Sequence, residues 1–384
     1  MLPRERFNKA LNFEEPDRAP IDLGSYQSGM CWKAYLNLKN YLTENGSGLQ
    51  INSHPNQVEI FEPHQGLAKV DEGIKELLGI DTRYVFPQPP SHYQEGFEHG
   101  NGETRHTDWL GVTWIKSSSS EYFDPMIHPL SDATKGDLDN YNWPEPGSRI
   151  VNGVVDKAKY LHESTDYAIG TTIPGLYETS WYMTGLERML KAWGSDIEFV
   201  KSLLDKMLSV LADFYEIYLG EIGQYLDFVA FYEDIGGQKD PVFNPEQYRA
   251  IVKPRTSRLV SLIKEIADVK VAHHCCGVIR PFLEDIIETG VDIINPVQVT
   301  ATGNEDTESL NRDFGNRIAF WGAIDTQRTL PFGTPSEVRD EVLRRLDDLA
   351  PGGGYLLASV HNIQNDVPPE NILAMFETAK EWSY

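Results

Sequence analysis

The stretch VKVAHHCCGVIRPFLEDIIETGVDIINPVQ, residues 269–298, decides the fold. It begins with a short β-rich run over 269–272 and continues with apolar residues at helical spacing over 278–288. A second β-rich run follows over 292–297. A strand, a helix and a strand in succession predict a parallel unit with a right-handed crossover, with the helix covering one face of the sheet.

The same alternation continues on both sides of this stretch. Strands are predicted over 225–232, 317–324 and 354–360, and helices over 245–267, 335–349 and 369–382. The helix over 335–349 has Thr334 as its N-cap candidate, with Glu337 three residues later. Further strand candidates over 19–23, 82–86 and 166–173 bring the total close to the eight of a closed barrel. Periodicity alone fits a doubly wound sheet equally well.

Residues 97–149 interrupt this pattern. The segment is rich in Gly, Ser, Asp and Pro, and we interpret it as an excursion from the sheet. A lid over the site and an elaborated surface loop are both open interpretations. We expect the whole chain, residues 1–384, to form one domain around one large core, because 40% of its residues are hydrophobic.

Composition excludes several classes of partner. The chain carries 34 Lys and Arg against 58 Asp and Glu, a formal net charge of −24, which repels nucleic acid and anionic membranes. No segment approaches the roughly 20 apolar residues of a membrane span, and the N-terminal residues do not resemble a signal peptide. The 3 cysteines form a poor disulfide framework, since Cys275 and Cys276 are adjacent and Cys31 stands alone. We expect a cytoplasmic protein, and a homodimer is left open.

Polar side chains follow five consecutive predicted strands. The carboxyl ends of parallel strands meet at one face of a barrel, where barrel enzymes build their active sites. A single polar residue at such a place is more often a satisfied loop residue, but five strands in a row indicate a site. In chain order these residues are Glu233 and Asp234; His273, His274, Cys275 and Cys276; Asn295 and Gln298; Asp325 and Gln327; and His361, Asn362 and Gln364.

The pair His274 and Cys276 is the strongest of these elements. Imidazole and thiolate suit a borderline-soft ion such as zinc, and two ligands one residue apart on a turn can bind one ion from the same side. Spacing alone leaves a buried histidine with two inert thiols equally open.

The motif His274-Cys275-Cys276-Gly277 resembles one from the zinc-dependent methyltransferase branch of the uroporphyrinogen decarboxylase superfamily, which includes methylcobamide:coenzyme M methyltransferases. The resemblance covers nearly the whole chain, and it implies a single-domain (β/α)₈ barrel. It also rests on Arg4-Glu5-Arg6, Asp17-Arg18-Ala19-Pro20, Gly290-Val291-Asp292-Ile293-Ile294-Asn295-Pro296, Phe320-Trp321-Gly322-Ala323-Ile324-Asp325 and Pro368-Pro369-Glu370-Asn371-Ile372.

The resemblance implies a zinc ion held by His274, Cys276 and a third residue before the last helix. Family members carry a second cysteine at that place, and here the position falls on His361. One thiolate and two neutral imidazoles leave the complex a formal charge of about +1, which makes the ion a stronger Lewis acid. We therefore expect zinc to polarise a methyl donor rather than to activate a thiol.

The function implied is methyl transfer between a small O-, N- or S-methylated compound and either a corrinoid carried by a partner protein or a thiol. We expect Glu233, Asp234 and Asp325 to be catalytic, with Glu233 or Asp234 the candidate general acid or partner of a metal ligand. The fourth zinc position is expected to be open or to carry Glu233 or water. The residues expected to bind substrate are Tyr26, Tyr232, Asn295, Gln298, Gln327 and Gln364. Aromatic residues such as Tyr26, Trp32 and Tyr232 would suit an aryl ether, and they fit a hydrophobic core equally well.

Two other functions are kept as alternatives. The first is decarboxylation of a small carboxylated substrate, although residues 24–33, where the superfamily's decarboxylases place arginines for substrate carboxylates, contain no Arg. The second is a non-catalytic barrel that binds zinc or another ligand. A structural zinc site normally shows four protein ligands, and only three good ones are found here.

Overall fold

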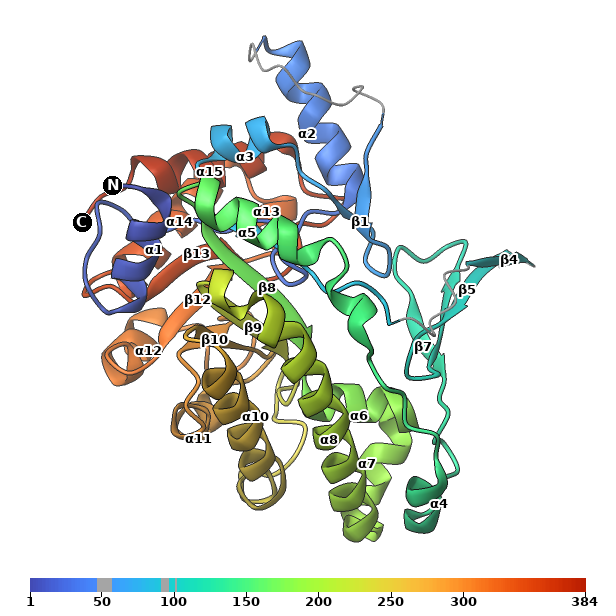
Figure 1. The fold of residues 1–384 in the computed structure, drawn as a ribbon. Coiled ribbons are helices and arrows are strands. Elements are labelled where there is room, and N and C mark those ends of the chain that lie inside the picture. The colour runs from blue at the N-terminus through green and yellow to red at the C-terminus, as the bar shows by residue number, and fades with distance from the viewer. Residues whose placement is uncertain (47–56, 91–96, 101) are drawn as a thin grey trace.

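The computed structural model describes residues 1–46, 57–90, 97–100 and 102–384. Within these residues, seven parallel strands form one curled sheet in the order β13-β12-β11-β10-β9-β8-β3, with helices around its outside (Figure 1). The strands are β3 (Thr82–Tyr84), β8 (Ala168–Pro174), β9 (Phe228–Tyr232), β10 (Lys270–His274), β11 (Ile293–Asn295), β12 (Ala319–Ile324) and β13 (Tyr355–Ser359).

The segment around Ile21 takes the eighth place and closes the sheet. Ile21 makes a parallel bridge to Leu357 on β13, and the backbone N–H of Asp81 donates to its carbonyl at 2.8 Å. The segment is shorter than the strand predicted over 19–23 because Pro20 has no N–H to give and Gly24 turns the chain at φ +118°. The predicted (β/α)₈ barrel is confirmed.

Helices follow the strands as the alternation predicts. The predicted helix over 335–349 matches α14, and Thr334 and Glu337 form its capping box. The helix predicted over 245–267 is divided by a π-turn, because Pro254 in the first turn of α10 has no N–H to donate. The α-helices of the second half are α9 (Pro245–Gln247), α10 (Lys253–Ile266), α11 (Leu283–Glu288), α12 (Thr307–Phe314), α13 (Thr329–Phe332), α14 (Pro335–Leu349) and α15 (Pro369–Glu381), and the π-turn is Tyr248–Val252.

The first half of the chain carries the excursion. Four antiparallel strands form a separate sheet that stands away from the barrel (Figure 1). These are β4 (Glu98–Gly100), β5 (Glu103–Thr107), β6 (Thr113–Ser117) and β7 (Asp124–Ile127), and a two-stranded pair, β1 (Ile60–Glu62) and β2 (Leu67–Ala68), precedes them. The α-helices of this half are α1 (Pro3–Leu11), α2 (Trp32–Glu44), α3 (Glu72–Leu78), α4 (Lys135–Asn140), α5 (Val154–Ser164), α6 (Leu176–Thr184), α7 (Leu186–Ser195) and α8 (Ile197–Ile222).

The interior of the barrel is filled by side chains. Phe7 and Leu11 of α1 pack with Phe228 and Trp321 from the strands, and all four are at most 2% exposed. The fit is close at Gly170, where an added Cβ would lie 2.3 Å from the Phe228 ring. Because the barrel itself is packed, a ligand site must lie at its mouth. Among the described helices, none is long and apolar enough to span a membrane.

Candidate metal centre

Three side chains with metal-binding atoms meet at the mouth of the barrel. His274 ends β10, Cys276 follows on the next turn, and His361 lies in the loop after β13. One ligand atom from each lies within 4.8 Å of the other two. Cys276 Sγ is 3.5 Å from His274 Nε2, and the two imidazole rings are 6.1 Å apart between centroids. The geometry therefore gathers the three residues that the sequence singles out as ligands.

Asn295 orients the first of these ligands. Parallel register places it beside His274 on the neighbouring strand, and its side-chain oxygen lies 2.5 Å from His274 Nδ1. An amide oxygen only accepts hydrogen bonds, so Nδ1 carries the proton and the lone pair of Nε2 faces Cys276. Burial lowers the pKa of both His274 and His361 to about 4, so both imidazoles are neutral and suited to bind a cation.

The donor set fits zinc. Two neutral imidazole nitrogens and one sulfur are typical zinc ligands, and three protein donors leave a tetrahedral ion one open position. Without a cation, burial and the nearby Asp234 carboxylate raise the pKa of the Cys276 thiol well above its usual range. A bound cation would favour the thiolate instead. Asp234 Oδ1 also accepts the Cys276 N–H at 2.7 Å and lies 4.0 Å from His274 Nε2.

The neighbouring residues in the motif face away from this cluster. The His273 ring stacks on Phe231 at 4.9 Å, and its Nε2 lies 3.2 Å from the Glu233 carbonyl. Cys275 is fully buried. Alternate residues of an extended segment point to opposite sides, which accounts for the division of the four residues into two pairs.

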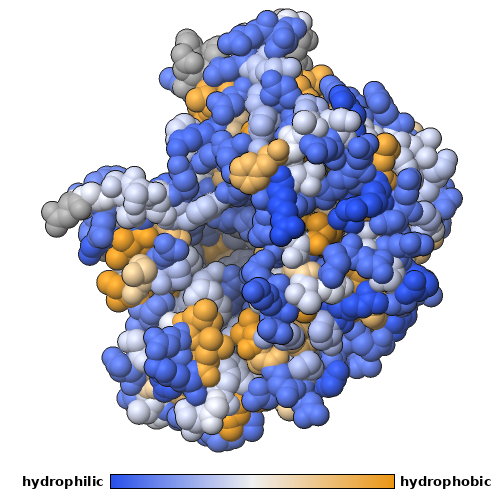
Figure 2. Space-filling view, turned by 180° about the vertical axis from the view of Figure 1, so that it is seen from behind, coloured by the Kyte–Doolittle hydropathy of each residue, from blue (hydrophilic) through white to orange (hydrophobic). Residues whose placement is uncertain are grey.

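A cavity of about 990 Å³ lies next to the three ligands. Figure 2 shows the recess between the protruding antiparallel sheet and the body of the barrel. Two ligands, His274 and His361, open into it together with Asp234. Its aromatic lining consists of Tyr26, Phe61, Phe86, Trp109, Trp114, Phe123, Trp181, Tyr182, Phe214 and Tyr232. This volume and lining are typical of a site for a small, largely apolar ligand.

Of the three aromatic residues considered from sequence, two line this cavity. The Tyr26 ring stacks on Phe86 at 4.2 Å and 12° between planes. Tyr232 ends β9 beside Asp234. Trp32 begins α2 and packs against the hydrophobic core instead.

Glu178 is a cavity residue that the sequence interpretation missed. It lies in the first turn of α6, directly after β8, and its carboxylate accepts hydrogen bonds from the Tyr182 hydroxyl and from the Asp234 N–H. Burial and, next, the Asp234 charge raise the pKa of Glu178 to about 8, while burial raises that of Asp234 to about 6. The rule that polar residues at strand ends form the site would have found it, had it been applied to the strand over 166–173.

Glu233 does not line this cavity, contrary to expectation. The strand turns it inward beneath α6, where its carboxylate accepts the Tyr177 N–H at 2.8 Å and caps the helix. Gly175 makes this approach feasible, since a Cβ there would lie 1.7 Å from the Tyr232 carbonyl oxygen. Glu233 is fully buried, and its second carboxylate oxygen has no partner among the described residues. Burial raises its pKa to about 8, so the capping group is protonated at neutral pH.

Three residues expected to bind substrate instead support neighbouring structure. Asn295 orients His274, as described above. Gln298 accepts the Gly277 N–H at 2.7 Å and so holds the turn after Cys276. The Gln364 side chain accepts from the Tyr122 hydroxyl and donates to the Asn362 carbonyl at 2.8 Å. None of the three lines the cavity.

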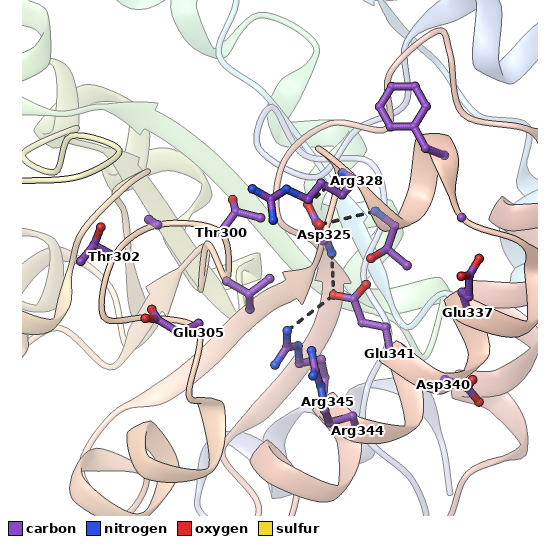
Figure 3. A pocket seen from close by; sticks show the side chains of 15 residues that line it. Thr300, Thr302, Glu305, Asp325, Arg328, Glu337, Asp340, Glu341, Arg344 and Arg345 are labelled. Carbon is purple, nitrogen blue, oxygen red and sulfur yellow. Dashed lines mark hydrogen bonds and ion pairs between the residues drawn. The ribbon is translucent and has the colours of Figure 1, made fainter.

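Asp325 and Gln327 lie elsewhere, which corrects the expectation that they join the cavity. Asp325 lines a second pocket of about 940 Å³ between the end of β12 and α14, where Figure 3 shows it beside Glu341. Its carboxylate accepts the Gln327 N–H at 2.7 Å, and the Gln327 side chain is bound by Thr300 at 2.8 Å. The cause is local: Ala323 adopts φ +75°, which breaks the alternation of side chains at the end of β12.

The chain resembles known proteins over much of its length. The family model for uroporphyrinogen decarboxylase (URO-D) matches residues 119–382. The uroporphyrinogen decarboxylase of Microcystis aeruginosa is 28% identical over 187 residues, which are 48% of this chain and 49% of that protein. This chain thus spans about half the length of that curated relative. The corresponding protein of Hydrogenovibrio crunogenus is 23% identical over 282 residues, 70% of this chain and 73% of that protein.

A solved structure described as a methyltransferase from Methanosarcina mazei superposes with a TM-score of 0.68. The match covers 99% of both chains at 17% sequence identity. At this identity, the likeness establishes the shared fold.

Proposed function

The chain belongs to the uroporphyrinogen decarboxylase family, and we propose that it is a zinc-dependent methyltransferase within it. It would move a methyl group from a small methylated compound to a reduced corrinoid carried by a second protein. The observation that carries the proposal is the convergence of His274, Cys276 and His361 at an aromatic-lined cavity. The methyltransferase from Methanosarcina mazei shares the fold on which this site is built.

His274, Cys276 and His361 would hold the ion, with the cavity side as the open position. When bound, zinc would supply Lewis-acid polarisation of the heteroatom that carries the methyl group. Asn295 would keep the His274 lone pair directed at the metal, and Asp234 would fix the Cys276 backbone through its 2.7 Å hydrogen bond. These contacts orient the ligands before any substrate arrives.

The lining favours an aromatic methyl donor, such as an aryl methyl ether. Tyr26, Phe86 and Phe61 form a continuous stack, with ring centroids 4.2 and 5.2 Å apart between neighbours. Tyr26 and Phe86 present their rings at the wall of the same cavity as the metal ligands, so they could pack against an aromatic substrate. A thiol acceptor in place of the corrinoid stays a second form of the same reaction.

We propose that the corrinoid protein docks at the open mouth of the cavity. The described helices and strands belong to the barrel and to the antiparallel sheet beside it. Figure 2 shows a recess between them. A corrinoid presented there would meet a methyl donor held in the cavity.

Decarboxylation is the alternative that the names of the curated relatives favour. A substrate with several carboxylates would need cationic recognition, yet no arginine is found among the described residues lining the cavity. The cations there are Lys69, which Glu59 binds at 2.9 and 3.0 Å, and Lys157. Five carboxyl groups share the lining, and those that are ionised would repel such a substrate.

A metal assay and a transfer assay together test the proposal. Purified chain should contain one zinc per molecule and methylate a cobalt(I) corrinoid from aryl methyl ethers, as seen in the visible spectrum of the corrinoid. Cys276→Ser should lose zinc and transfer, whereas Cys275→Ser should keep both, because Cys275 faces away from the cluster. Full zinc in Cys276→Ser would refute the ligand assignment. Release of carbon dioxide from a carboxylated substrate, without methyl transfer from any donor, would favour the decarboxylase.

A further inference from the structure

A second carboxyl group stands behind Asp234 in the cavity. Glu178 Oε2 accepts the Asp234 N–H at 3.1 Å, and Oε1 accepts the Tyr182 hydroxyl. Asp234 in turn accepts the Cys276 N–H and lies 4.0 Å from His274 Nε2. Both carboxyl groups open into the cavity. Glu178 is therefore linked to the candidate metal ligands through Asp234, and it lines the same cavity as His274 and His361.

The surroundings of Glu178 hold it in one place. Tyr182 lies one helical turn later on α6, so both side chains lie on the same face of that helix. The Tyr182 ring packs edge-on against Trp114 of the antiparallel sheet, with centroids 5.0 Å apart. The hydrogen bonds from Tyr182 and from Asp234 hold the Glu178 carboxyl at both oxygens, and the group opens into the cavity.

Two carboxyl groups that open into one buried cavity favour a state with one proton and one negative charge, because two nearby negative charges are unfavourable at low dielectric. Asp234 accepts the backbone N–H of Cys276 and is the nearer of the two to the candidate cation site. It is therefore the better place for the negative charge, and Glu178 for the proton. The raised pKa of Glu178, about 8, agrees with this distribution.

We propose that Glu178 is the proton donor to the heteroatom that loses its methyl group. This inference rests on the proposed function. In the step, the bond between the methyl carbon and the heteroatom breaks, and its electron pair stays on the heteroatom. The methyl carbon bonds to the cobalt(I) corrinoid, whose electron pair forms the new bond and which becomes formally cobalt(III). The proton passes from the Glu178 carboxyl to the heteroatom, and Glu178 is left as a carboxylate.

The inference narrows the substrate class. A proton donor is useful where the leaving group is a strong base, such as an alkoxide or the phenolate of an electron-rich ring. Sulfonium and quaternary ammonium donors release a neutral thioether or amine when the methyl group is transferred, so the leaving group needs no proton. The pairing of Glu178 with an aromatic cavity thus favours an ether whose phenol is weakly acidic.

A series of aryl methyl ethers tests the role in the transfer assay with cobalt(I) corrinoid. Glu178→Gln should slow ethers of weakly acidic phenols by about 10²- to 10⁴-fold, the usual contribution of a general acid. It should slow a methyl sulfonium donor or an ether of a strongly acidic phenol no more than a few-fold, and this retained activity also shows that the variant folds. Glu62→Gln alters another buried carboxyl of the same cavity and should leave the dependence on leaving-group acidity unchanged.

The pH profile gives a further reading of the same group. Transfer from weakly acidic phenol ethers should fall as the pH rises through the pKa of Glu178 in the wild type, and the Glu178→Gln profile should lack this fall. The titratable groups that interact with Glu178 are Asp234, Tyr177, Tyr182, Tyr232, Glu233, Cys275 and Cys276. Tyr182→Phe removes one hydrogen bond to the Glu178 carboxyl. It should shift the midpoint of the pH profile but leave the fall in rate present.

Infrared difference spectroscopy follows the proton without turnover, zinc or corrinoid. The wild type should show protonated-carboxyl absorption that declines as the pH rises through about 8, from Glu178 and from Glu233, and Glu178→Gln should lose the Glu178 part of it. If the wild type transfers methyl groups while Glu178→Gln keeps all of that absorption and the wild-type leaving-group dependence, the inference alone fails. Failure of the wild type to transfer from every donor would overturn the proposed function and this role with it.

Discussion

Replacing Asn295 with leucine isolates the contribution of ligand orientation to metal binding. In the protein, the amide oxygen accepts the His274 Nδ1 proton at 2.5 Å, while the side-chain N–H donates to the Trp321 carbonyl at 3.3 Å. Leucine has nearly the same shape but no acceptor. The buried Nδ1–H then loses its partner, which costs about 1–3 kcal/mol in stability. Loss of such a partner weakens metal binding by about 10- to 100-fold, or roughly 1.4–2.7 kcal/mol.

Competition with a chromophoric chelator measures the zinc affinity, and denaturant titration measures the stability. Asn295→Asp is the matched control, because it keeps an acceptor opposite Nδ1 and should bind zinc at least as tightly as the wild type. Zinc affinity in Asn295→Leu equal to that of the wild type, while His274→Ala loses the metal, would refute the orienting role.

Three further predictions concern other residues of the mouth. Burial raises the Glu62 pKa from 4.5 to about 7. The protonated Glu62 therefore contributes to the free energy of unfolding fully below pH 4.5, and this contribution is lost as the pH rises through about 7. Glu62→Gln should remove up to about 3 kcal/mol of that decline, measured by urea denaturation at several pH values. Asp325→Ala should cost about 1–2 kcal/mol, because three backbone N–H groups lose their acceptor, yet leave the zinc content unchanged in elemental analysis. Gly175→Ala should lower stability by about 3 kcal/mol, the upper end of the usual cost of overpacking, since its Cβ would overlap the Tyr232 carbonyl. Thermal unfolding measures this change, and a melting temperature like that of the wild type would contradict the contact.

Local chemistry is what made the helices and strands predictable. Thr334 and Glu337 cap α14 through contacts between residues three apart, and the predicted boundaries of that helix match. The strand around residue 21 was harder, because its partners Leu357 and Asp81 are distant in sequence and only closure of the barrel brings them together. The division of the helix over 245–267 depends on the hydrogen bond that Pro254 cannot make, which periodicity does not register.

The candidate metal ligands also divide into those that are close in sequence and one that is distant. His274 and Cys276 are neighbours in sequence, so their spacing indicated a shared ion, although it left a buried histidine with two inert thiols equally open. His361 is distant, and no spacing rule connects it to them. It came from the resemblance to a family in which a cysteine holds that place, and the fold brings its ring to within 6.1 Å of His274 between centroids. Parallel strands supply this convergence, because each of them ends at the same face of the barrel.

The strand-end rule fails where the direction of a side chain, rather than its position, decides the outcome. Glu233 and Asp234 both follow β9, yet one turns beneath α6 as its cap and the other opens into the cavity. Asp325 follows β12 at the same face, but the positive φ of Ala323 turns it toward α14. A sequence gives the number of residues between a strand and a carboxyl group, and one irregular backbone angle reverses the side on which that group emerges. A search for acid groups in such barrels should therefore include the first turn of each following helix, where Glu178 lies.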